Sequence, residues 1–299
     1  KQMINEAKHA INLYYGKKSI LLVNKKKAFP LHGLKEISFD KIEIISRRNR
    51  KKISIKDINK LPKILKKKVQ KDIYLISTKK NNFSNLNFKK LPNVMGILNL
   101  TPDSFSDGGK YNKKNSALKH VNDLFLSGSD IVDIGGESTK PGSNNINEKK
   151  EWNRIKHVIK KIGKKKNISL DTRKSKIMEK GILRGVNLVN DVSGLSFDSN
   201  SINVLKKYKI PFVLQHTQGT PDIMQKNPKY KNALLDIYDY FFEKLKKIRK
   251  AGILHNNIIL DPGIGFGKNL KHNIQILRDI SLFHSFGFPI LLGISRKRF

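Results

Sequence analysis

Residues 94–109 read Val-Met-Gly-Ile-Leu-Asn-Leu-Thr-Pro-Asp-Ser-Phe-Ser-Asp-Gly-Gly, an apolar run followed directly by a polar loop. The apolar part, residues 94–98, has the length and continuity of a buried β-strand. The loop from Asn99 to Gly109 holds two carboxylates, three hydroxyls and a pair of glycines. That composition is typical of a segment that moves and closes over a ligand.

The same unit, an apolar run followed by a polar loop, recurs toward the C-terminus. Helix-length segments separate the runs, which predicts a parallel sheet with right-handed crossovers. The further apolar runs are residues 131–134, 168–170, 188–189, 211–214, 258–260 and 289–294.

Two folds share this alternation, the doubly wound sheet and the (β/α)8 barrel. A doubly wound sheet gathers its functional groups at one switch point, whereas every strand feeds the mouth of a barrel. Here almost every strand ends in Asp, Asn, Thr or Gln. We therefore predict an α/β fold, a (β/α)8 TIM barrel over residues 91–299. Seven strands can be counted, so the barrel is expected to be truncated before its eighth strand, which would lie beyond Phe299.

The N-terminal region has a different pattern. Its apolar runs at residues 19–23 and 41–45 are broken by polar turns, and a helical stretch around 58–69 precedes a polar segment at 78–87 that resembles a linker. We predict a small α+β extension over residues 1–90, of unknown role. The chain starts at Lys1 and stops after an apolar run, so we expect a fragment.

The net charge of +37 invites a nucleic-acid interpretation. The basic residues are nevertheless dispersed, in runs such as Lys25–Lys27, without aromatic interleaving or zinc spacing. We expect no dedicated nucleic-acid partner. The chain has no cysteine, which fits a reducing cytoplasm, and no run long and apolar enough for a membrane span.

The strand ends together form a candidate site. Taken alone, each residue has an ordinary structural explanation. Asn190 could cap a helix. His216 could be a packed, hydrogen-bonded histidine, since no second histidine stands at metal-ligand spacing. In a barrel, however, the ends of all the strands meet at one mouth, so a polar residue at nearly every strand end indicates a shared site. The set comprises Asn99; Thr139, Lys140 and Pro141 in the loop after Asp133; Asp171; Asn190; Gln215; Asp261, Gly265 and Phe266; and Gly293 and Lys297.

Two kinds of ligand group match this set. The acceptors Asp171, Asn190 and Asp261 suit a flat heterocycle that presents amino and ring N–H donors, with a lysine to offset the burial of charge. Thr139, Lys140 and the glycine N–H groups suit a phosphate, and Asn99 can offer an oxygen to Mg²⁺.

These motifs resemble those of dihydropteroate synthases. The loop Asn99–Gly109 is present whole, and the Asp133–Gly142, Asp-Thr, Asn-Asp, Asp-Pro-Gly-x-Gly-Phe-Gly-Lys and Ser-Arg-Lys motifs follow in family order from about Leu91 to Phe299. The resemblance implies that 4-aminobenzoate displaces pyrophosphate from (7,8-dihydropterin-6-yl)methyl diphosphate. It also implies Mg²⁺ as cofactor, a cation-like path that needs no strong base, and a homodimer formed through barrel helices.

The resemblance assigns roles motif by motif. Asp171, Asn190, Asp261 and Lys297 would hold the pterin, beside Gln215, Gly265 and Gly293. Asn99, Thr139 and Lys140 would bind pyrophosphate and Mg²⁺. Phe105, Pro141 and Phe266 would shape the aminobenzoate pocket, and Asp103 and Asp107 would order the closed loop. The expected catalytic set is Asn99, Asp103, Asp107, Asp171 and Lys297.

Four departures from the family pattern matter. Gln215 stands where the family usually has Met, Lys140 where it has Arg, and Arg298 where a small Ser is common. The family's final Arg-x-His motif, which grips pyrophosphate, is absent. We therefore expect the 299-residue chain to show no turnover. Two alternatives remain open: a methyltetrahydrofolate-binding methyltransferase domain and a non-catalytic pterin- or polyanion-binding paralogue.

Overall fold

The computed structural model describes residues 7–89, 92–101, 114–138, 143, 145–219, 228–295 and 297. The chain forms two compact units. The first comprises residues 1–81, 229–245 and 270–290, and the second comprises residues 82–228, 246–269 and 291–299.

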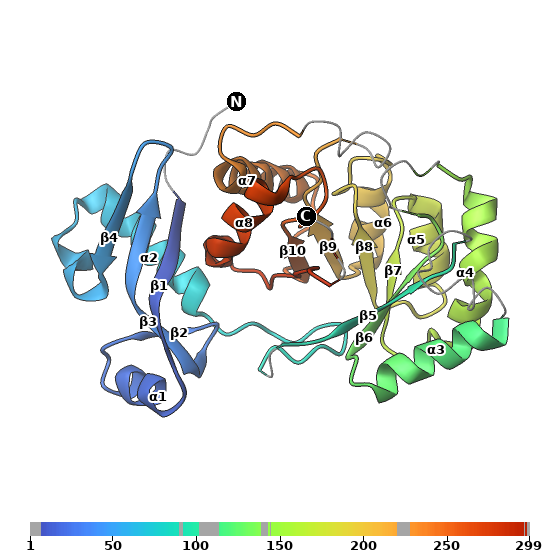
Figure 1. The fold of residues 1–299 in the computed structure, drawn as a ribbon, viewed down its shortest axis with the longest axis horizontal. Coiled ribbons are helices and arrows are strands. Elements are labelled where there is room, and N and C mark those ends of the chain that lie inside the picture. The colour runs from blue at the N-terminus through green and yellow to red at the C-terminus, as the bar shows by residue number, and fades with distance from the viewer. Residues whose placement is uncertain are drawn as a thin grey trace. The chain divides into compact units, whose positions relative to one another are not determined.

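The first unit contains a four-stranded antiparallel sheet (Figure 1). Its strands are β1 (Ala7–Tyr15), β2 (Phe29–Leu31), β3 (Leu34–Ile45) and β4 (Arg50–Ser54), and β3 pairs with each of the other three. The helices are α1 (Gly16–Asn24), η1 (Ile55–Lys60) and α2 (Lys63–Ser77). Helix α2 starts directly after Pro62, which can begin a helix but not continue one. The predicted α+β character is thus present, although the apolar run at 19–23 is helical.

The same unit includes three helical segments from the C-terminal part of the sequence. These are the first part of α7 (Ala233–Lys250), α8 (Leu270–Arg278) and η2 (Ile280–Phe286). Arg47 of the β3–β4 turn pairs with Asp236 and Asp239 at 2.7 Å each. Arg50 pairs with Asp279 at 2.7 Å. The N-terminal sheet is therefore packed against helices that the sequence places in the barrel region.

The second unit contains a six-stranded parallel sheet in the order β10-β9-β8-β7-β6-β5 (Figure 1). The strands are β5 (Met95–Asn99), β6 (Ile131–Gly135), β7 (Ile168–Asp171), β8 (Leu188–Asp191), β9 (Phe212–Gln215) and β10 (Ile258–Asp261). The helices between them are α3 (Lys114–Leu126), α4 (Glu148–Ile162), α5 (Ser175–Ile182) and α6 (Ser201–Tyr208). Six of the seven predicted strands are confirmed, in the predicted parallel arrangement.

The two faces of this sheet pack differently. Leu98, Val132, Ile134 and Leu170 belong to a buried cluster that includes residues from α3 and α4. Alternate residues such as Ile131, Leu188 and Val213 pack instead with Phe83, Leu86 and Phe88. The segment predicted as a linker at 78–87 contains the boundary between the two units, after Asn81, and its Phe83 and Leu86 pack against the sheet.

The predicted strand at residues 289–294 is not formed. Ile290 makes one isolated bridge, and the Leu291 N–H donates to the Leu260 carbonyl at 2.9 Å. A strand needs a ladder of such bonds. The described residues 291–294 instead run as an irregular segment beside β10.

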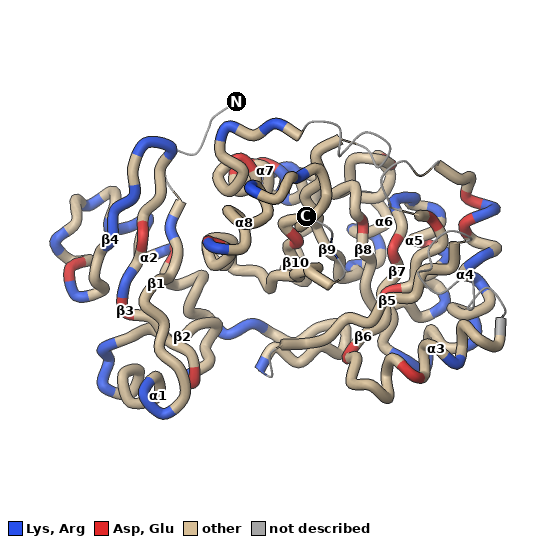
Figure 2. Tube along the Cα trace, viewed as in Figure 1, with Lys and Arg blue, Asp and Glu red and all other residues tan. Residues whose placement is uncertain are grey.

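Charge is distributed unevenly between the sheet and the rest of the second unit (Figure 2). The six strands contain no Lys or Arg, although the chain holds 61 of these residues. Their only charged residues are Asp133, Asp171, Asp191 and Asp261. The six parallel strands of a strongly basic protein thus carry carboxylates as their only charged groups. Among the described residues, no helix combines the length and apolar composition needed to cross a membrane.

Candidate active site

Four neighbouring strands bring predicted site residues into one row. Asn99 pairs in register with Gly135, Gly135 with Asp171, and Asp171 with Asn190. Gly135 leaves room between its neighbours: a Cβ there would lie 3.0 Å from Asn99 Oδ1 and 3.2 Å from Asp171 Oδ2. The absence of a side chain at Gly135 therefore lets an amide oxygen and a carboxylate approach each other.

A buried hydrogen bond joins this row to a residue one layer below. Asn190 Nδ2 donates to Asp133 Oδ2 at 2.8 Å, and both residues are buried. Burial raises the pKa of Asp133, while Ser169 and Asn190 oppose that rise. Asp133 was expected only as part of a motif, without a role of its own.

Asp171 lies in an acidic environment. Burial raises its pKa well above the usual range, and the charges of Asp133, Glu151, Asp191 and Glu137 raise it further. A carboxyl in these surroundings is stabilised by a ligand that brings N–H donors or positive charge. The part of the row around Asp171 is therefore suited to an amino-substituted heterocycle and unsuited to an anion.

Asp261 forms the other side of the candidate site. It is the register partner of Gln215, and its Oδ1 accepts the Gly263 N–H at 2.7 Å. Burial raises its pKa to about 6, while Gly263, Lys268 and Lys297 act in the opposite direction. The Lys297 ammonium lies 4.1 Å from the centre of the Phe266 ring. The predicted Lys297 is thus near Asp261, and its ammonium lies over the ring of Phe266 in the loop after β10.

A second lysine near Asp261 was missed. Lys268 is buried, and its ammonium contacts the carbonyls of Gly263 and Phe266 at 2.8 Å each and His216 Nδ1 at 3.0 Å. Burial lowers its pKa to about 7. Lys268 therefore holds the loop that carries Phe266 against the end of β9. In a sequence with so many lysines, only its position at the end of a glycine-rich motif could have singled it out.

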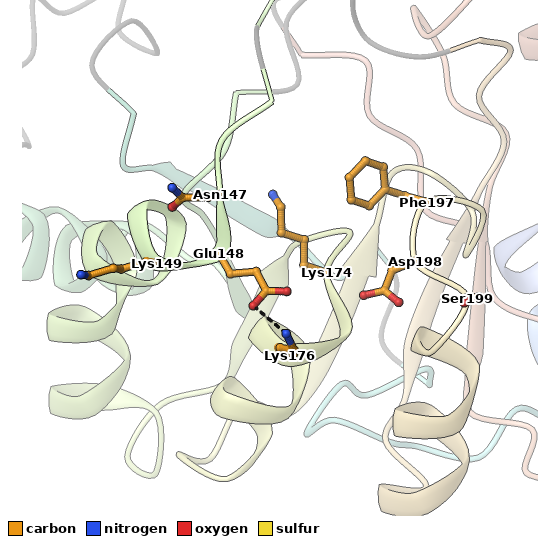
Figure 3. Close-up of a pocket in the computed structure, with 8 residues that line it drawn as sticks. All are labelled: Asn147, Glu148, Lys149, Lys174, Lys176, Phe197, Asp198 and Ser199. Carbon is orange, nitrogen blue, oxygen red and sulfur yellow. Dashed lines mark ion pairs between the residues drawn. The ribbon is translucent and has the colours of Figure 1, made fainter.

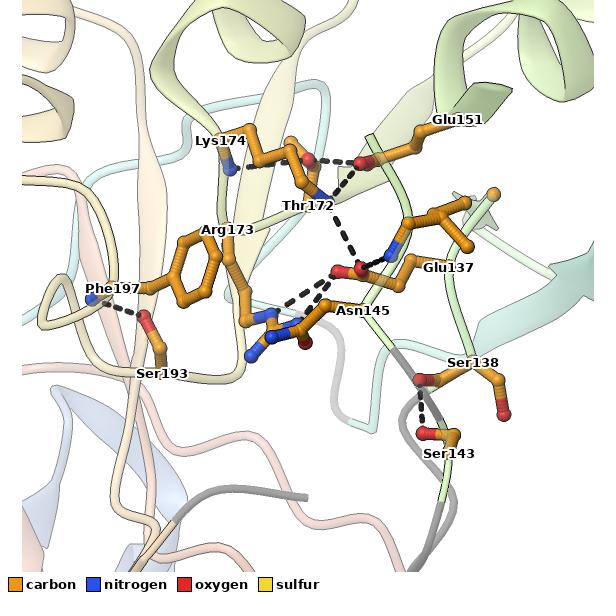
Figure 4. Close-up of polar contacts among 12 residues, drawn as sticks. Glu137, Ser138, Ser143, Asn145, Glu151, Thr172, Arg173, Lys174, Ser193 and Phe197 are labelled. Atoms are coloured by element: carbon orange, nitrogen blue, oxygen red, sulfur yellow. Dashed lines mark hydrogen bonds and ion pairs between the residues drawn. The ribbon is translucent and has the colours of Figure 1, made fainter. Parts of the chain in front are cut away.

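A buried ionic network supports the loop after β6 (Figure 4). Glu137 pairs with Arg173 and Lys174 at 2.9 Å each and accepts the Ile146 N–H at 3.0 Å. Lys174 also pairs with Glu151 at 2.6 Å. Glu137 and Ile146 lie on either side of residues 138–145, so this network joins the two ends of that segment. The roles of these residues could not be predicted, because one sequence does not distinguish buried ion pairs from surface charges.

Six predicted residues lie outside the described residues. Of the others, Gln215 is buried at the end of β9, and Gly293 is exposed in the irregular segment after Leu291. The structure therefore brings together Asn99, Asp171 and Asn190 in one group and Asp261, Phe266 and Lys297 in another. The residues outside the description are Asp103, Phe105, Asp107, Thr139, Lys140 and Pro141.

Residues 95–299 match the model of a family described as pterin binding enzymes. A dihydropteroate synthase from Escherichia coli is 40% identical over 208 residues, which span 69% of this chain and 73% of that protein. The chain belongs to the dihydropteroate synthase family. A solved Yersinia pestis dihydropteroate synthase with a sulfonamide drug matches with a TM-score of 0.68 and 40% identity, covering 71% of this chain and 77% of that one.

A second solved relative carries a substrate-like molecule. The Xanthomonas albilineans dihydropteroate synthase with 4-aminobenzoic acid matches with a TM-score of 0.63 and 34% identity, covering 69% of this chain and 74% of that one. Dihydropteroate synthases are TIM barrels, so the six parallel strands described here are part of a barrel. The predicted barrel and the predicted family are thus confirmed.

One described hollow in this family member lies away from the row of strand-end residues (Figure 3). It has a volume of about 640 Å³ and adjoins the ionic network through Lys174. Ligand sites gather convergent polar groups on an apolar wall. This hollow contains none of the predicted site residues, so we do not place the pterin there. Its lining residues are Asn147, Glu148, Lys149, Lys174, Lys176, Phe197, Asp198 and Ser199.

A cluster of metal-ligand types occurs in the first unit. One atom each of His9, Glu43 and Asp279 lie within 4.8 Å of one another, and all three residues are buried. Arg50 contacts Glu43 at 3.2 Å and Asp279 at 2.7 Å, and Arg278 contacts Asp279 at 3.0 Å, so guanidinium groups already pair with both carboxylates. We therefore interpret this cluster as an ion-pair network and not as the metal site expected of a dihydropteroate synthase.

Proposed function

We propose that this protein is a dihydropteroate synthase, a transferase of folate biosynthesis. It condenses 4-aminobenzoate with (7,8-dihydropterin-6-yl)methyl diphosphate and releases pyrophosphate and 7,8-dihydropteroate. The observation that carries the proposal is that the six parallel strands carry only carboxylates as charged groups, in a chain of net charge +37. It agrees with the 40% identity to a dihydropteroate synthase. Buried acceptors without lysine among the strands match the N–H donors of an aminopyrimidinone.

The pterin would be held between the two groups of described residues. Asp171 and Asn190 supply acceptors on one side, and Asp261 with Lys297 supplies a carboxylate and a cation on the other. Gln215, Gly265 and Gly293 complete this pocket in the proposal. A carboxylate can accept two parallel N–H bonds from an amino group and a ring nitrogen, and Lys297 can donate to the exocyclic carbonyl oxygen.

The aminobenzoate and diphosphate ends are proposed from the motifs. Phe266, with Phe105 and Pro141, would line the aminobenzoate side, and Asp103 and Asp107 would order the loop over it. Thr139 and Lys140 would donate to the diphosphate. An aromatic amine is unprotonated at neutral pH, so the reaction needs stabilisation of the leaving pyrophosphate more than it needs a base.

We further propose that the divalent metal of this family is Mg²⁺ here and that Asn99 is its protein ligand. Asn99 Oδ1 lies beside Asp171 across Gly135, at the end of β5. Mg²⁺ keeps several waters and takes one or two protein oxygens plus phosphate oxygens, so a single amide ligand fits. When bound, the ion would neutralise charge on the departing pyrophosphate.

Other properties are also proposals. Residues 1–90 would be an extension to a barrel over 91–299, the protein would be a cytoplasmic homodimer, and it would have no dedicated nucleic-acid partner. The N-terminal sheet stabilises α7, α8 and η2 through Arg47 and Arg50, so its removal would weaken that unit.

Incorporation of labelled 4-aminobenzoate into pteroate tests the function. The complete gene product is supplied with the pterin diphosphate and Mg²⁺, with and without a sulfonamide. We expect incorporation that the sulfonamide inhibits. In parallel, fluorescence titration measures binding of 6-hydroxymethylpterin to the 299-residue chain. Binding without incorporation by the complete protein would indicate the non-catalytic pterin-binding paralogue instead, and absence of both would overturn the proposal.

A further inference from the structure

Asp133 and Asn190 meet inside the sheet from strands that are not neighbours. Asp133 is on β6 and Asn190 on β8, with β7 between them. The Asn190 Nδ2 donates to Asp133 Oδ2 at 2.8 Å. Asp133 is 6% and Asn190 7% exposed, so solvent does not compete for this bond.

The bond determines which end of the amide points away from Asp133. The two ends of an asparagine amide have opposite chemistry, and a carboxylate can only accept. Nδ2 must therefore face Asp133, and Oδ1 must face the other way. Without a carboxylate at Asp133, the amide would be free to turn and present its N–H groups instead.

Two buried acceptors are left without donors. Asn190 Oδ1 and Asp133 Oδ1 have no hydrogen-bond partner among the described residues. A buried acceptor without a donor costs free energy, and native proteins rarely leave one unless a ligand or water fills the role. Asp171, the register partner of Asn190, adds a further acceptor beside them. Three adjacent acceptors suit a ligand edge made of N–H donors.

We propose that Asp133 is a positioning residue that directs the Asn190 oxygen toward the ligand and so determines selectivity for an amino-substituted heterocycle. The inference rests on the proposed pterin binding and deepens it. A 2-amino pteridine presents adjacent N–H donors on its pyrimidine edge, whereas the 2-oxo analogue replaces the amino donors with an acceptor. By orienting the Asn190 amide, Asp133 therefore favours binding of the 2-amino pteridine over binding of the 2-oxo analogue.

A double-mutant cycle tests this coupling. The 299-residue wild type, D133A, N190A and D133A/N190A are titrated with 6-hydroxymethylpterin and with its 2-oxo analogue, 6-hydroxymethyl-lumazine, by fluorescence. We expect D133A to weaken pterin binding about tenfold, the scale of one hydrogen bond, and lumazine binding much less. In the N190A background, D133A should cause no further loss. Equal losses for both ligands, or additive losses, would overturn the proposal.

Three further variants separate positioning from folding. D133N keeps one acceptor oxygen and should restore most of the selectivity, which a purely structural role would not require. S169A removes a hydroxyl that acts on the pKa of Asp133 but leaves the Asp133–Asn190 bond intact, so a positioning role through that bond predicts that S169A keeps wild-type selectivity. If D133A is not folded by circular dichroism, D133L replaces it in the cycle with the same expected outcomes. A wild type that binds neither ligand would instead refute the proposed function.

Discussion

The ammonium of Lys268 lies 3.0 Å from Nδ1 of His216, and both residues are buried. This contact joins the loop after β10 to the end of β9. The fit is close, because a Cβ at Gly263 would lie only 2.0 Å from the His216 carbonyl. The shape of the loop that carries Phe266 therefore depends on Lys268.

Replacing Lys268 by Met should destabilise the protein and displace Phe266. The variant leaves the carbonyls of Gly263 and Phe266 without their ammonium donor, and an unsatisfied buried carbonyl costs about 1–3 kcal/mol. Urea unfolding near pH 7 measures the loss. K271M, at an exposed position on α8, is the matched control and should unfold like the wild type.

The stability difference between wild type and K268M should depend on pH. The pKa of Lys268 is lowered to about 7 in the folded protein, from 10.5. Between these values the unfolded chain binds a proton that the folded chain does not, so this group makes stability rise with pH. K268M lacks the group, and the difference between the two should therefore widen from pH 7 toward pH 10. A constant difference would show that Lys268 stays charged in the fold.

Replacing Glu137 by Gln should weaken the ionic network at the ends of residues 138–145. The change leaves Arg173 and Lys174 with less negative charge at buried positions, and breaking such a pair typically costs about 3–5 kcal/mol. Thermal unfolding and fluorescence titration with 6-hydroxymethylpterin measure the effect. E148Q disrupts an exposed pair with Lys176 and should change neither. Equal effects of E137Q and E148Q would contradict the assignment.

The histidines of the first unit predict sensitivity to acid. His32 Nε2 and His284 Nδ1 lie 2.7 Å apart, and burial lowers their pKa values to about 2 and about 4. Below pH 6.5, the usual pKa of histidine, the unfolded chain binds protons that the folded chain does not bind. Stability therefore falls as the pH falls. The slope should approach about 1.4 kcal/mol per pH unit per histidine between pH 6.5 and 4.

Substitution of the pair provides the check on that slope. The double variant H32L/H284L should lose most of the acid sensitivity between pH 6.5 and 4 in urea unfolding. The control H120N replaces a histidine whose side chain is partly exposed, and it should retain the wild-type slope. An unchanged slope in the double variant would assign the effect to other groups.

Alanine at Gly135 should reduce pterin binding with little effect on folding. The new Cβ would lie 3.0 Å from Asn99 Oδ1 and 3.2 Å from Asp171 Oδ2, tighter than ordinary van der Waals contact. Both side chains would have to shift, so we expect 6-hydroxymethylpterin to bind about tenfold more weakly, which corresponds to about 1.4 kcal/mol. Fluorescence titration measures this, and wild-type affinity would show that Asp171 does not contact the pterin.

Much of the fold could be predicted because its signals are local. The apolar runs ended one or two residues before β5 to β10 end, and the register across β5, β6, β7 and β8 then brought Asn99, Asp171 and Asn190 together. The strand at 289–294 failed because strand formation depends on a partner, and its own apolar pattern could not supply one. The predicted linker at 78–87 contains the boundary between the two units, but the packing of Phe83 and Leu86 against the sheet could not be predicted, because their apolar neighbours are distant in the sequence.

The sequence by itself determined the alternation of strands and helices, the family, and the identity of the residues at each strand end, because these depend on the order of residues along the chain. Only the tertiary structure decided that Asp133 orients Asn190, that Glu137 neutralises Arg173 and Lys174, and that Lys268 contacts His216. Each of these is a charged or polar group whose role depends on burial and on a partner distant in sequence. Among 61 Lys and Arg residues, only burial distinguishes the lysine that holds a loop from those that face water.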